Sequence, residues 1–432
     1  MDKVKRATIK RKPAEYIGEI SEMLSVNGLF EKYPQKSWEA WRRFDPANLL
    51  PLMHECVKNG VYNLPLIWKK VKDIEKTSEK NVCENMKIMK EWEKADPAFA
   101  NKVKDKLSKI KWNDENAFFP SLVEKLSDMS EVPVLRISAN EENTAPVHFI
   151  YAPKKDIRNF YSNFMIIFAE ENSNASVYIE SFSEGFCVLD NAVFLEKNAN
   201  LNLHCLMREG IGSNETKNSA WIWSQNATLD EGSSMLQGFF GAGGKLGKII
   251  SETNLNRMSS YRAYGIHVGN HSHIDHDFHI NHKESHSRSS LEFNMALLEH
   301  AYAVFSANIK IPENTVSCAA HQSNKNIILS ENSRADAIPR LEILTEEVEA
   351  SHGSATGELS DEELFYLTSR GLDEKEAKHL LLLGFFEDIL QKSLKHTQDK
   401  TAYKDPFLHD IWCAIQDRTQ INFDRSFLNT GE

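Results

Sequence analysis

The residues best suited to chemistry are a group of histidines within residues 267–286. Side chains on a strand alternate between two faces, so His271 and His273 can converge, and His276 can meet His282 across a turn. Imidazole is a common ligand of Zn, Ni and Fe(II), but the spacing here matches no recognised ligand pattern. We therefore expect polar ladders along an exposed face, and we keep a stand-alone metal-binding protein as an alternative. The seven histidines are His267, His271, His273, His276, His279, His282 and His286.

A glycine-rich segment at residues 238–248 invites comparison with a phosphate-binding loop. A Walker motif requires Gly, four residues, then Gly-Lys and a Ser or Thr. Here Ala242 stands where the first Gly should be, and Ile249 replaces the hydroxyl residue that would bind magnesium. We predict a β-turn or a flexible loop at this segment, and any ATP that is used would bind to another subunit.

His352 lies where the character of the sequence changes. Up to Val348 the apolar residues alternate, which predicts a half-buried strand. Residues 351–354 are small and polar and predict a turn, and Ser360 with Glu363 forms a capping box that opens a helix. An imidazole therefore sits between a sheet-like body and a helical one. From the residues alone, a turn histidine that hydrogen-bonds to the backbone is the favoured interpretation.

The first part of the chain, residues 1–125, is predicted to be a helical domain. Apolar residues recur at steps of three and four over residues 66–112, with a break near Asp96 and Pro97. A further helix is expected over residues 16–24. The Trp-containing segment at residues 37–42 is interpreted as core packing, not as a surface aromatic site.

Residues 126–348 are predicted to form a β domain made of many short strands separated by polar turns. Weakly self-similar units, including a recurring Asn-Ala pair, are typical of stacked coils that bury one continuous core. A sandwich remains possible from the residues alone. A carbohydrate-active β-helix enzyme is a functional alternative, and it would need acidic or basic residues clustered on adjacent coils. The runs are 147–150, 164–168, 177–179, 193–195, 201–203 and 221–223.

Residues 349–432 are predicted to form a C-terminal helical domain. Asp373 and Glu376 make a second capping pattern, and an apolar stripe follows at helical spacing. The run at residues 380–383 with Phe385 and Phe386 is more apolar than one buried face requires. We expect burial on two sides, against the β body and against a partner, with a tight helical hairpin as the alternative.

Composition restricts the class of protein. The net charge of −11 argues against a general nucleic-acid binder, and no apolar run is long enough to span a membrane. The basic N-terminus is not followed by an apolar segment, so we expect no secretory signal. The six cysteines form no CxxC pair, which predicts buried thiols in a reducing, cytoplasmic setting. The chain has no Gly-x-Ser-x-Gly motif for a nucleophilic serine.

A specific pattern of residues runs through the segment around His352. Its members are Pro339, Leu341, Glu342, Ile343, Ser351, His352, Gly353, Thr356, Gly357, Leu364, Phe365, Tyr366, Leu367, Ser369, Arg370 and Gly371. This pattern resembles the C-terminal signature of the SufB/SufD family, the scaffold proteins of the SUF iron–sulfur cluster assembly system. Gly353 and Leu367 resemble SufD more than SufB. A weaker likeness extends upstream through Val304, Phe305, Gln322, Asn324 and Leu329.

The resemblance implies a right-handed parallel β-helix between N-terminal and C-terminal helical domains. It further implies a non-enzymatic scaffold subunit that pairs with a SufB-like subunit, or with itself, through strand edges near residues 300–350. The helices after Ser360 would dock a SufC-like ABC ATPase, so its activity would reside in that partner. The implied docking residues are Leu364, Phe365, Tyr366, Arg370 and Gly371.

The resemblance also implies a role for His352, which would face the partner subunit and contact iron or a nascent iron–sulfur cluster. No cofactor is expected to be bound stably by this chain. Family members often carry a Cys two residues before this His, and the chain has Ala350 there. Because a thiolate is the natural ligand of iron in such clusters, the partner would have to supply it.

Overall fold

The structure is a computed structural model of the 432-residue chain. It describes residues 13–26, 29, 33–35, 46–62, 66–70, 85–112, 116–142, 147–151, 159–183, 185–209, 219–242 and 244–394. The segment at residues 37–42 and everything after residue 394 therefore lie outside the described residues.

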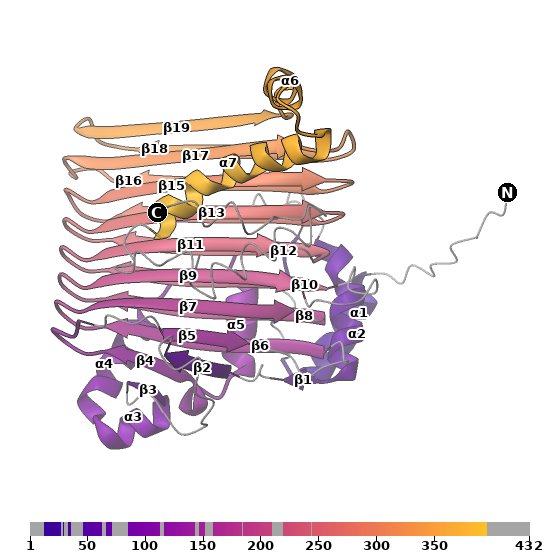
Figure 1. The fold of residues 1–432 in the computed structure, drawn as a ribbon. Coiled ribbons are helices and arrows are strands. Elements are labelled where there is room, and N and C mark those ends of the chain that lie inside the picture. Colours follow the sequence, from indigo (N-terminus) through magenta and orange to yellow (C-terminus); the bar gives the residue numbers. More distant parts are fainter. Residues whose placement is uncertain are drawn as a thin grey trace.

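The centre of the molecule is a parallel β-helix built from two long sheets (Figure 1). Sheet A runs, in spatial order, through β18 (Arg334–Ile343), β16 (Tyr302–Ile311), β14 (His273–His282), β12 (Leu246–Leu255), β10 (Ala220–Leu229), β8 (Gly185–Leu195), β6 (Asn159–Ala169), β4 (Pro133–Ile137) and β3 (Met86–Ile88), with β1 (Val61–Tyr62) beside β6. Sheet B runs through β19 (Val348–Gly357), β17 (Cys318–Ile328), β15 (Arg288–Leu298), β13 (Ser260–Asn270), β11 (Ser234–Ala242), β9 (Asn200–Glu209), β7 (Asn174–Ser183), β5 (Val147–Tyr151) and β2 (Leu66–Lys70).

Successive strands from β6 onward alternate between the two sheets, so each coil contributes one strand to each sheet. Neighbouring coils pair in parallel and in register, as the pairs of Asp190 with Ser224 and of Gln237 with Ala263 illustrate. A sandwich of antiparallel hairpins is therefore excluded for this part of the chain. The predicted fold class, a parallel β-helix with helices at both ends, is confirmed.

The sharp corners of the coils explain part of the sequence repeat. Asn172, Asn198, Gly232 and Met258 follow one another at one corner, and all four have positive φ. Asparagine and glycine adopt this left-handed conformation more readily than other residues do. The Asn198 side chain donates to Oδ1 of Asn172 over 3.1 Å. One of the Asn-Ala pairs seen in the sequence thus marks a corner of the coil.

The interior of the β-helix is apolar over most of its length, and glycines make room for the large rings in it. A Cβ atom at Gly241 would lie 2.7 Å from the His267 ring, and one at Gly247 would lie 2.4 Å from the Trp221 ring. These glycines belong to strands β11 and β12, with a short turn at residues 244–245. The glycine-rich segment is therefore mostly strand, and the prediction of a turn or loop holds only for its middle.

The N-terminal helices cover part of the outside of sheet A. The helices are α1 (Pro13–Met23), η3 (Pro46–Leu49), α2 (Leu50–Asn59), α3 (Met89–Ala95), α4 (Pro97–Ser108), α5 (Phe118–Leu126) and η5 (Met129–Glu131). The helices α1, α2 and α5 pack on Phe160, Phe186 and Ile222. The break at Asp96 is confirmed, since its carboxylate caps α4 by accepting from the Phe99 N–H.

Two stretches that were predicted to be helical are strands. Residues 66–70 form β2, and residues 86–88 form β3. Both pair antiparallel with the first strands of the β-helix, β5 and β4. Short apolar runs fit either period, and the open edge of the first coil decides in favour of strands.

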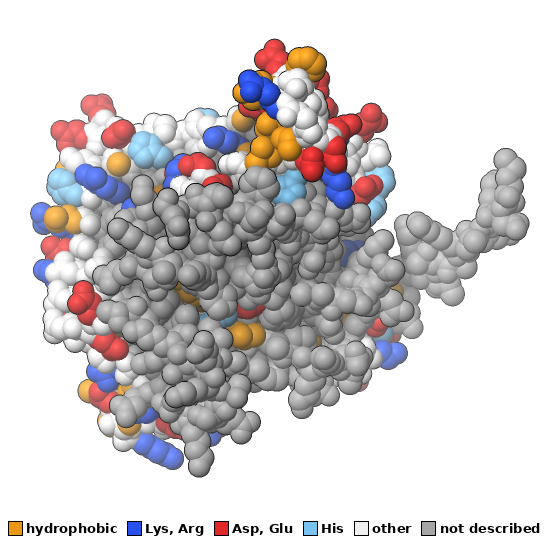
Figure 2. Space-filling model, viewed as in Figure 1, with side chains coloured by type: hydrophobic (Ala, Val, Ile, Leu, Met, Phe, Trp, Pro, Cys, Tyr) orange, Lys and Arg blue, Asp and Glu red, His pale blue; other side chains and the backbone are white. Residues whose placement is uncertain are grey.

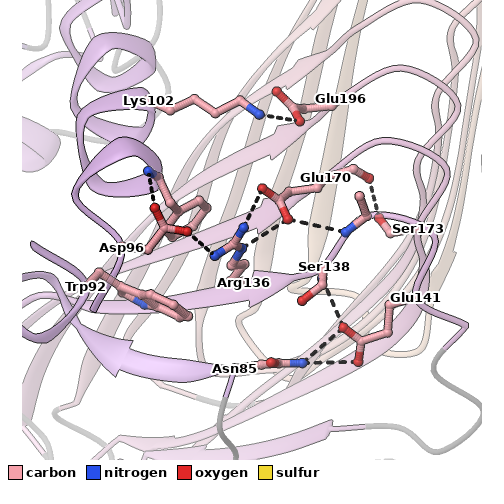
Figure 3. Close-up of polar contacts among 12 residues, drawn as sticks. Asn85, Trp92, Asp96, Lys102, Arg136, Ser138, Glu141, Glu170, Ser173 and Glu196 are labelled. Carbon is pink, nitrogen blue, oxygen red and sulfur yellow. Dashed lines mark hydrogen bonds and ion pairs between the residues drawn. The ribbon is translucent and has the colours of Figure 1, made fainter. Parts of the chain in front are cut away.

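Helix α4 is fixed to successive corners of the β-helix by ion pairs (Figure 3). Arg136 bridges Asp96 and Glu170, with N···O distances of 2.8 and 3.0 Å. Lys102, on α4, pairs with Glu196 of the next coil at 2.7 Å. One turn further along the helix, Lys106 pairs with Asp230 of the coil after that. Ion pairs therefore hold the α4 region against three successive coils.

The C-terminal helices are α6 (Asp361–Ser369) and α7 (Glu374–Leu394). Figure 1 shows α7 lying across sheet B and α6 standing at the end of the stack beside β19. Leu382, Phe386 and Ile389 of α7 are buried against the sheet, which confirms one of the two predicted buried sides. Strand β19 continues the β-helix to Gly357, beyond the predicted boundary at residue 348. The three-part domain division itself stays a prediction.

Candidate functional site: the open end of the β-helix

The two ends of the β-helix differ. At the first coil, sheets A and B end in the short antiparallel strands β3 and β2, of three and five residues. At the last coil, β18 and β19 are the terminal strands of sheets A and B, and no described strand pairs beyond them. Their outer backbone edges are thus available for pairing with another chain.

Residues 351–354 lie within β19, so the predicted turn is wrong. Each of them pairs with a residue of β17, as Ser351 does with His321. Small polar residues favour turns locally. The partner strand β17 lies thirty residues earlier in the chain, and backbone pairing with it overrides that preference.

His352 points to the interior side of the last coil. It pairs with Gln322, and the same row continues through Leu291 and Ala263, both of which are buried in the core. Side chains at paired positions lie on one face of a sheet. His352 is nevertheless exposed, because no described coil covers it. Glu349, three residues before this imidazole, lies on the opposite face and approaches His321 at 3.9 Å.

The polar residues next to His352 were not predicted as a site. Gln322, Asn324 and Asn326 occupy alternate positions of β17 and share the face of His352. Asn326 donates to Oδ1 of Asn324 over 2.7 Å and to the hydroxyl of Thr356 over 3.1 Å. The alternation of amide residues was visible in the sequence, but the side that they face follows only from the register. We call these four residues and His352 the polar rim.

The polar rim supplies few ligands for iron. Ala350, the position at which the family resemblance implies a cysteine, lies on the same face as His352 and packs against the core. Cys318 is buried, with its sulfur 3.7 Å from the carbonyl of Glu284. Among the described residues, the rim therefore offers one imidazole, side-chain amides and a hydroxyl. This set, without a thiolate, does not fit an iron–sulfur cluster held by the rim residues alone.

The predicted docking residues come together on α6. Ser360 caps the helix, since its hydroxyl accepts from the Glu363 N–H. Phe365 and Tyr366 are 73% and 57% exposed, and the Arg370 guanidinium lies over the Tyr366 ring at 5.1 Å. Figure 2 shows hydrophobic side chains on this projecting helix, with acidic and basic ones beside them. Exposed aromatic residues on a small element are typical of protein-binding surfaces.

The remaining two docking residues flank this exposed pair. Leu364 is half-buried at the start of α6, and Gly371 is exposed just after its end with a φ of 100°. What α6 binds stays a prediction.

The histidine-rich segment is mainly buried, contrary to the expected ladder on an exposed face. Inside the β-helix, His267 and His276 share a hydrogen bond of 3.0 Å, and Trp221 stacks on His267. His282 contacts the hydroxyls of Ser287 and Ser289. Burial lowers the pKa of His267 to about 3 and that of His282 to about 4. Gly241 of β11 provides the space for the His267 ring, which the sequence did not reveal.

The expected convergences for metal binding are not formed. His271 lies at a corner with positive φ, while His273 begins β14. Among the described residues, no group of three or more His, Cys, Asp or Glu side chains is placed to hold a metal ion. The stand-alone metal-binding alternative therefore has no site in this part of the chain.

Charged residues do cluster on adjacent coils outside sheet A, as a carbohydrate enzyme would require. Lys248 and Asp275 form an ion pair of 2.6 Å, but the lysine side chain is completely buried. Asp277 is held by Asn116 at 2.6 Å and by His279 at 3.3 Å. Although burial opposes it, the pairing with Asp277 raises the pKa of His279. These groups bind one another and are shielded from a polymeric substrate.

Comparison with known proteins places the fold in a family. A family model described as "SUF system FeS cluster assembly, SufBD core domain" matches residues 151–385, which is more than half of the chain. That span covers most of the β-helix, the polar rim and α6.

Individual relatives match shorter segments. The chain is 43% identical over 93 residues to an iron–sulfur cluster assembly SufBD family protein of Mycobacterium leprae, covering 21% of this chain and 24% of the relative. It is 29% identical over 89 residues to SufD of Escherichia coli, covering 21% of each chain. With SufD of Plasmodium berghei it shares 24% identity over 239 residues, covering 52% of this chain and 17% of the relative.

The matched segments span about a quarter or less of these curated relatives.

Among the described residues, no helix has the length and apolar character needed to cross a membrane.

Proposed function

The chain belongs to the SufBD family of the SUF iron–sulfur cluster assembly system, and from this membership we propose that it is a non-enzymatic scaffold subunit. It pairs with a SufB-like subunit, or with a second copy of itself, and it docks a SufC-like ABC ATPase. Its own chemistry is binding, and ATP hydrolysis resides in the partner.

The observation that carries this proposal is the contrast between the two ends of the β-helix. The first coil ends in the short antiparallel strands β2 and β3, of five and three residues, whereas β18 and β19 end the other side of the stack with edges ten residues long that are free among the described residues. Exposed strand edges of this kind pair readily with other strands, and proteins usually cover or disrupt them. A second subunit stacked on this end would satisfy both edges at once.

The exposed aromatic residues of α6 supply the ATPase docking surface. Phe365 and Tyr366 project from a helix that buries none of its own residues. Aromatic side chains held in this way are frequent hot spots of protein interfaces. Because α6 stands beside β19, motion of the docked ATPase would reach the polar rim directly.

The cargo is iron or a nascent cluster, held between the two scaffold subunits. His352 contributes one nitrogen ligand from the polar rim, and the partner contributes thiolates, since Ala350 provides none. Neither subunit alone is expected to hold the cargo stably.

Anaerobic co-expression with SufB-like and SufC-like partners tests the proposal. We expect a complex that retains iron. The double change Phe365→Asp and Tyr366→Asp should remove the ATPase but keep the scaffold pair. His352→Ala should keep both partners and reduce iron severalfold.

Met258→Asp is a matched control for these changes, because it alters an exposed apolar residue at a corner far from α6. It should change neither readout. The proposal fails if the chain binds no partner under these conditions, or if iron content is the same with His352→Ala.

A further inference from the structure

The Gln322 side chain leaves one buried polar atom unused. Gln322 is only 3% exposed. Its Nε2 donates to the backbone oxygen of Arg340 over 3.3 Å, reaching from β17 across to β18. Its Oε1 is buried and has no hydrogen-bond partner. A buried acceptor without a donor costs free energy, so such an atom needs an explanation.

The orientation of this amide is fixed by its neighbour. If the amide were flipped, its oxygen would face the carbonyl oxygen of Arg340, and two acceptors would repel each other. The NH₂ group must therefore face Arg340. The oxygen is left to point elsewhere on the interior side of the last coils.

The donor at the position paired directly with Gln322 is His352. The two residues are direct partners in the parallel ladder between β17 and β19, on the same face. Neighbouring strands lie about 4.8 Å apart, a span that a glutamine side chain and an imidazole N–H can bridge. Ala350, the next residue along this face, has no donor in its side chain.

We propose that Gln322 is the positioning residue for His352: when the exposed imidazole turns toward β17, the unpaired Oε1 accepts one of its ring N–H groups. This hydrogen bond fixes the tautomer and directs the lone pair of the other ring nitrogen out of the last coil. An imidazole ligand is oriented in the same way by a hydrogen bond to its second nitrogen in many metal sites. The inference rests on the proposed function for the role of His352, but its test does not require the partners.

The test is the tautomer of His352 in the full chain, read from its ring ¹⁵N chemical shifts in histidine-labelled protein. The signal is assigned by its loss in His352→Asn. In the native chain we expect one dominant tautomer. Gln322→Met, which has similar volume but no strong acceptor, should give a mixture of tautomers.

Ser354→Ala is the matched control, because it removes a hydroxyl from the same face of β19 without touching the Gln322 amide. Its tautomer should equal that of the native chain. Equal tautomer populations in the native chain and in Gln322→Met would overturn the proposal. A failure of partner binding or iron retention, with the tautomer effect intact, would instead refute the scaffold function and leave the positioning role standing.

Discussion

Gly247 of β12 faces the Trp221 ring inside the β-helix, and its lack of a side chain is a packing requirement. A Cβ at this position would lie 2.4 Å from the ring, and the ring is itself completely surrounded. Gly247→Ala should therefore lower the free energy of unfolding by about 1–3 kcal/mol, as overpacked cores do. Urea unfolding measures this change.

Gly357→Ala is the control for that measurement. Nothing lies within 4 Å of a Cβ at Gly357, at the end of β19. Its unfolding free energy should stay within about 0.5 kcal/mol of the native value. An equal effect of the two substitutions would show that the close approach to Trp221 is not what matters.

Buried histidines make the stability of the fold sensitive to acid. Burial lowers the pKa of His204 to about 4 and that of His267 to about 3, while histidines in the unfolded chain titrate near 6.5. As the pH falls below about 6.5, the unfolded chain binds protons that the folded chain does not, so stability is lost. Each such histidine lowers the free energy of unfolding by up to ~1.4 kcal/mol for every unit by which the pH falls.

Asp190 acts in the opposite sense. Burial raises the pKa of its carboxyl to about 7, although the Ser224 hydroxyl donates to it. Stability from this group is present at low pH and is lost as the pH rises from about 4 through 7. Among the described residues, buried histidines with a lowered pKa outnumber Asp190. The free energy of unfolding should therefore decrease as the pH is lowered from 6.5 to 4.

His204→Gln checks this pH dependence. His204 hydrogen-bonds to the Ser393 carbonyl at 3.0 Å, and a Gln side chain keeps a donor without titrating. The slope of the free energy of unfolding against pH should decrease by the contribution of one buried histidine. An equal slope in the native protein and in His204→Gln would contradict the argument.

At the scale of elements, α6 and α7 differ in how they are held. Phe386 of α7 is completely buried against sheet B, whereas α6 buries none of its residues. Phe386→Ala should therefore destabilise the protein by about 3–5 kcal/mol. Phe365→Asp should cost less than about 0.5 kcal/mol.

Thermal unfolding separates these two cases. A large loss of stability on changing Phe365 would mean that α6 contributes to the fold and is not reserved for a partner. A negligible loss for Phe386 would mean that α7 is only loosely attached.

The sequence predicted those elements whose burial leaves a local pattern. The runs at 177–179 and 201–203 became strands whose alternate residues Val177, Ile179, Leu201 and Leu203 point into the core. The stretches at 66–70 and 351–354 were misassigned because distant strand pairing, not local preference, decides their structure. For the same reason His352 could be identified from its sequence pattern, while Gln322 could be placed beneath it only once the register was known.

At the scale of the whole molecule, the two ends of the stack offer different strand edges. The first coil carries the short strands β2 and β3 and the α3–α4 layer, with Arg136 and Lys102 fixing that layer to the corners. The last coil has no equivalent cover among the described residues, and its terminal strands β18 and β19 are each ten residues long. Long edges are the better template for pairing, so the association proposed above would use the end that holds His352, where the proposed partner and cargo would meet.

Proline substitutions in β19 can test this association directly. In a strand, successive N–H groups point to opposite sides, so adjacent residues donate either to β17 or to the free edge. Proline removes the donor and blocks close pairing on that side. Of the two variants Ser354→Pro and Ala355→Pro, one should lower the melting temperature because it breaks the pairing with β17. The other should leave the melting temperature unchanged yet abolish pairing with a SufB-like subunit or a second copy, as measured by sedimentation. If both proteins paired normally, the edge of β19 could not be the contact, and association would have to use another surface.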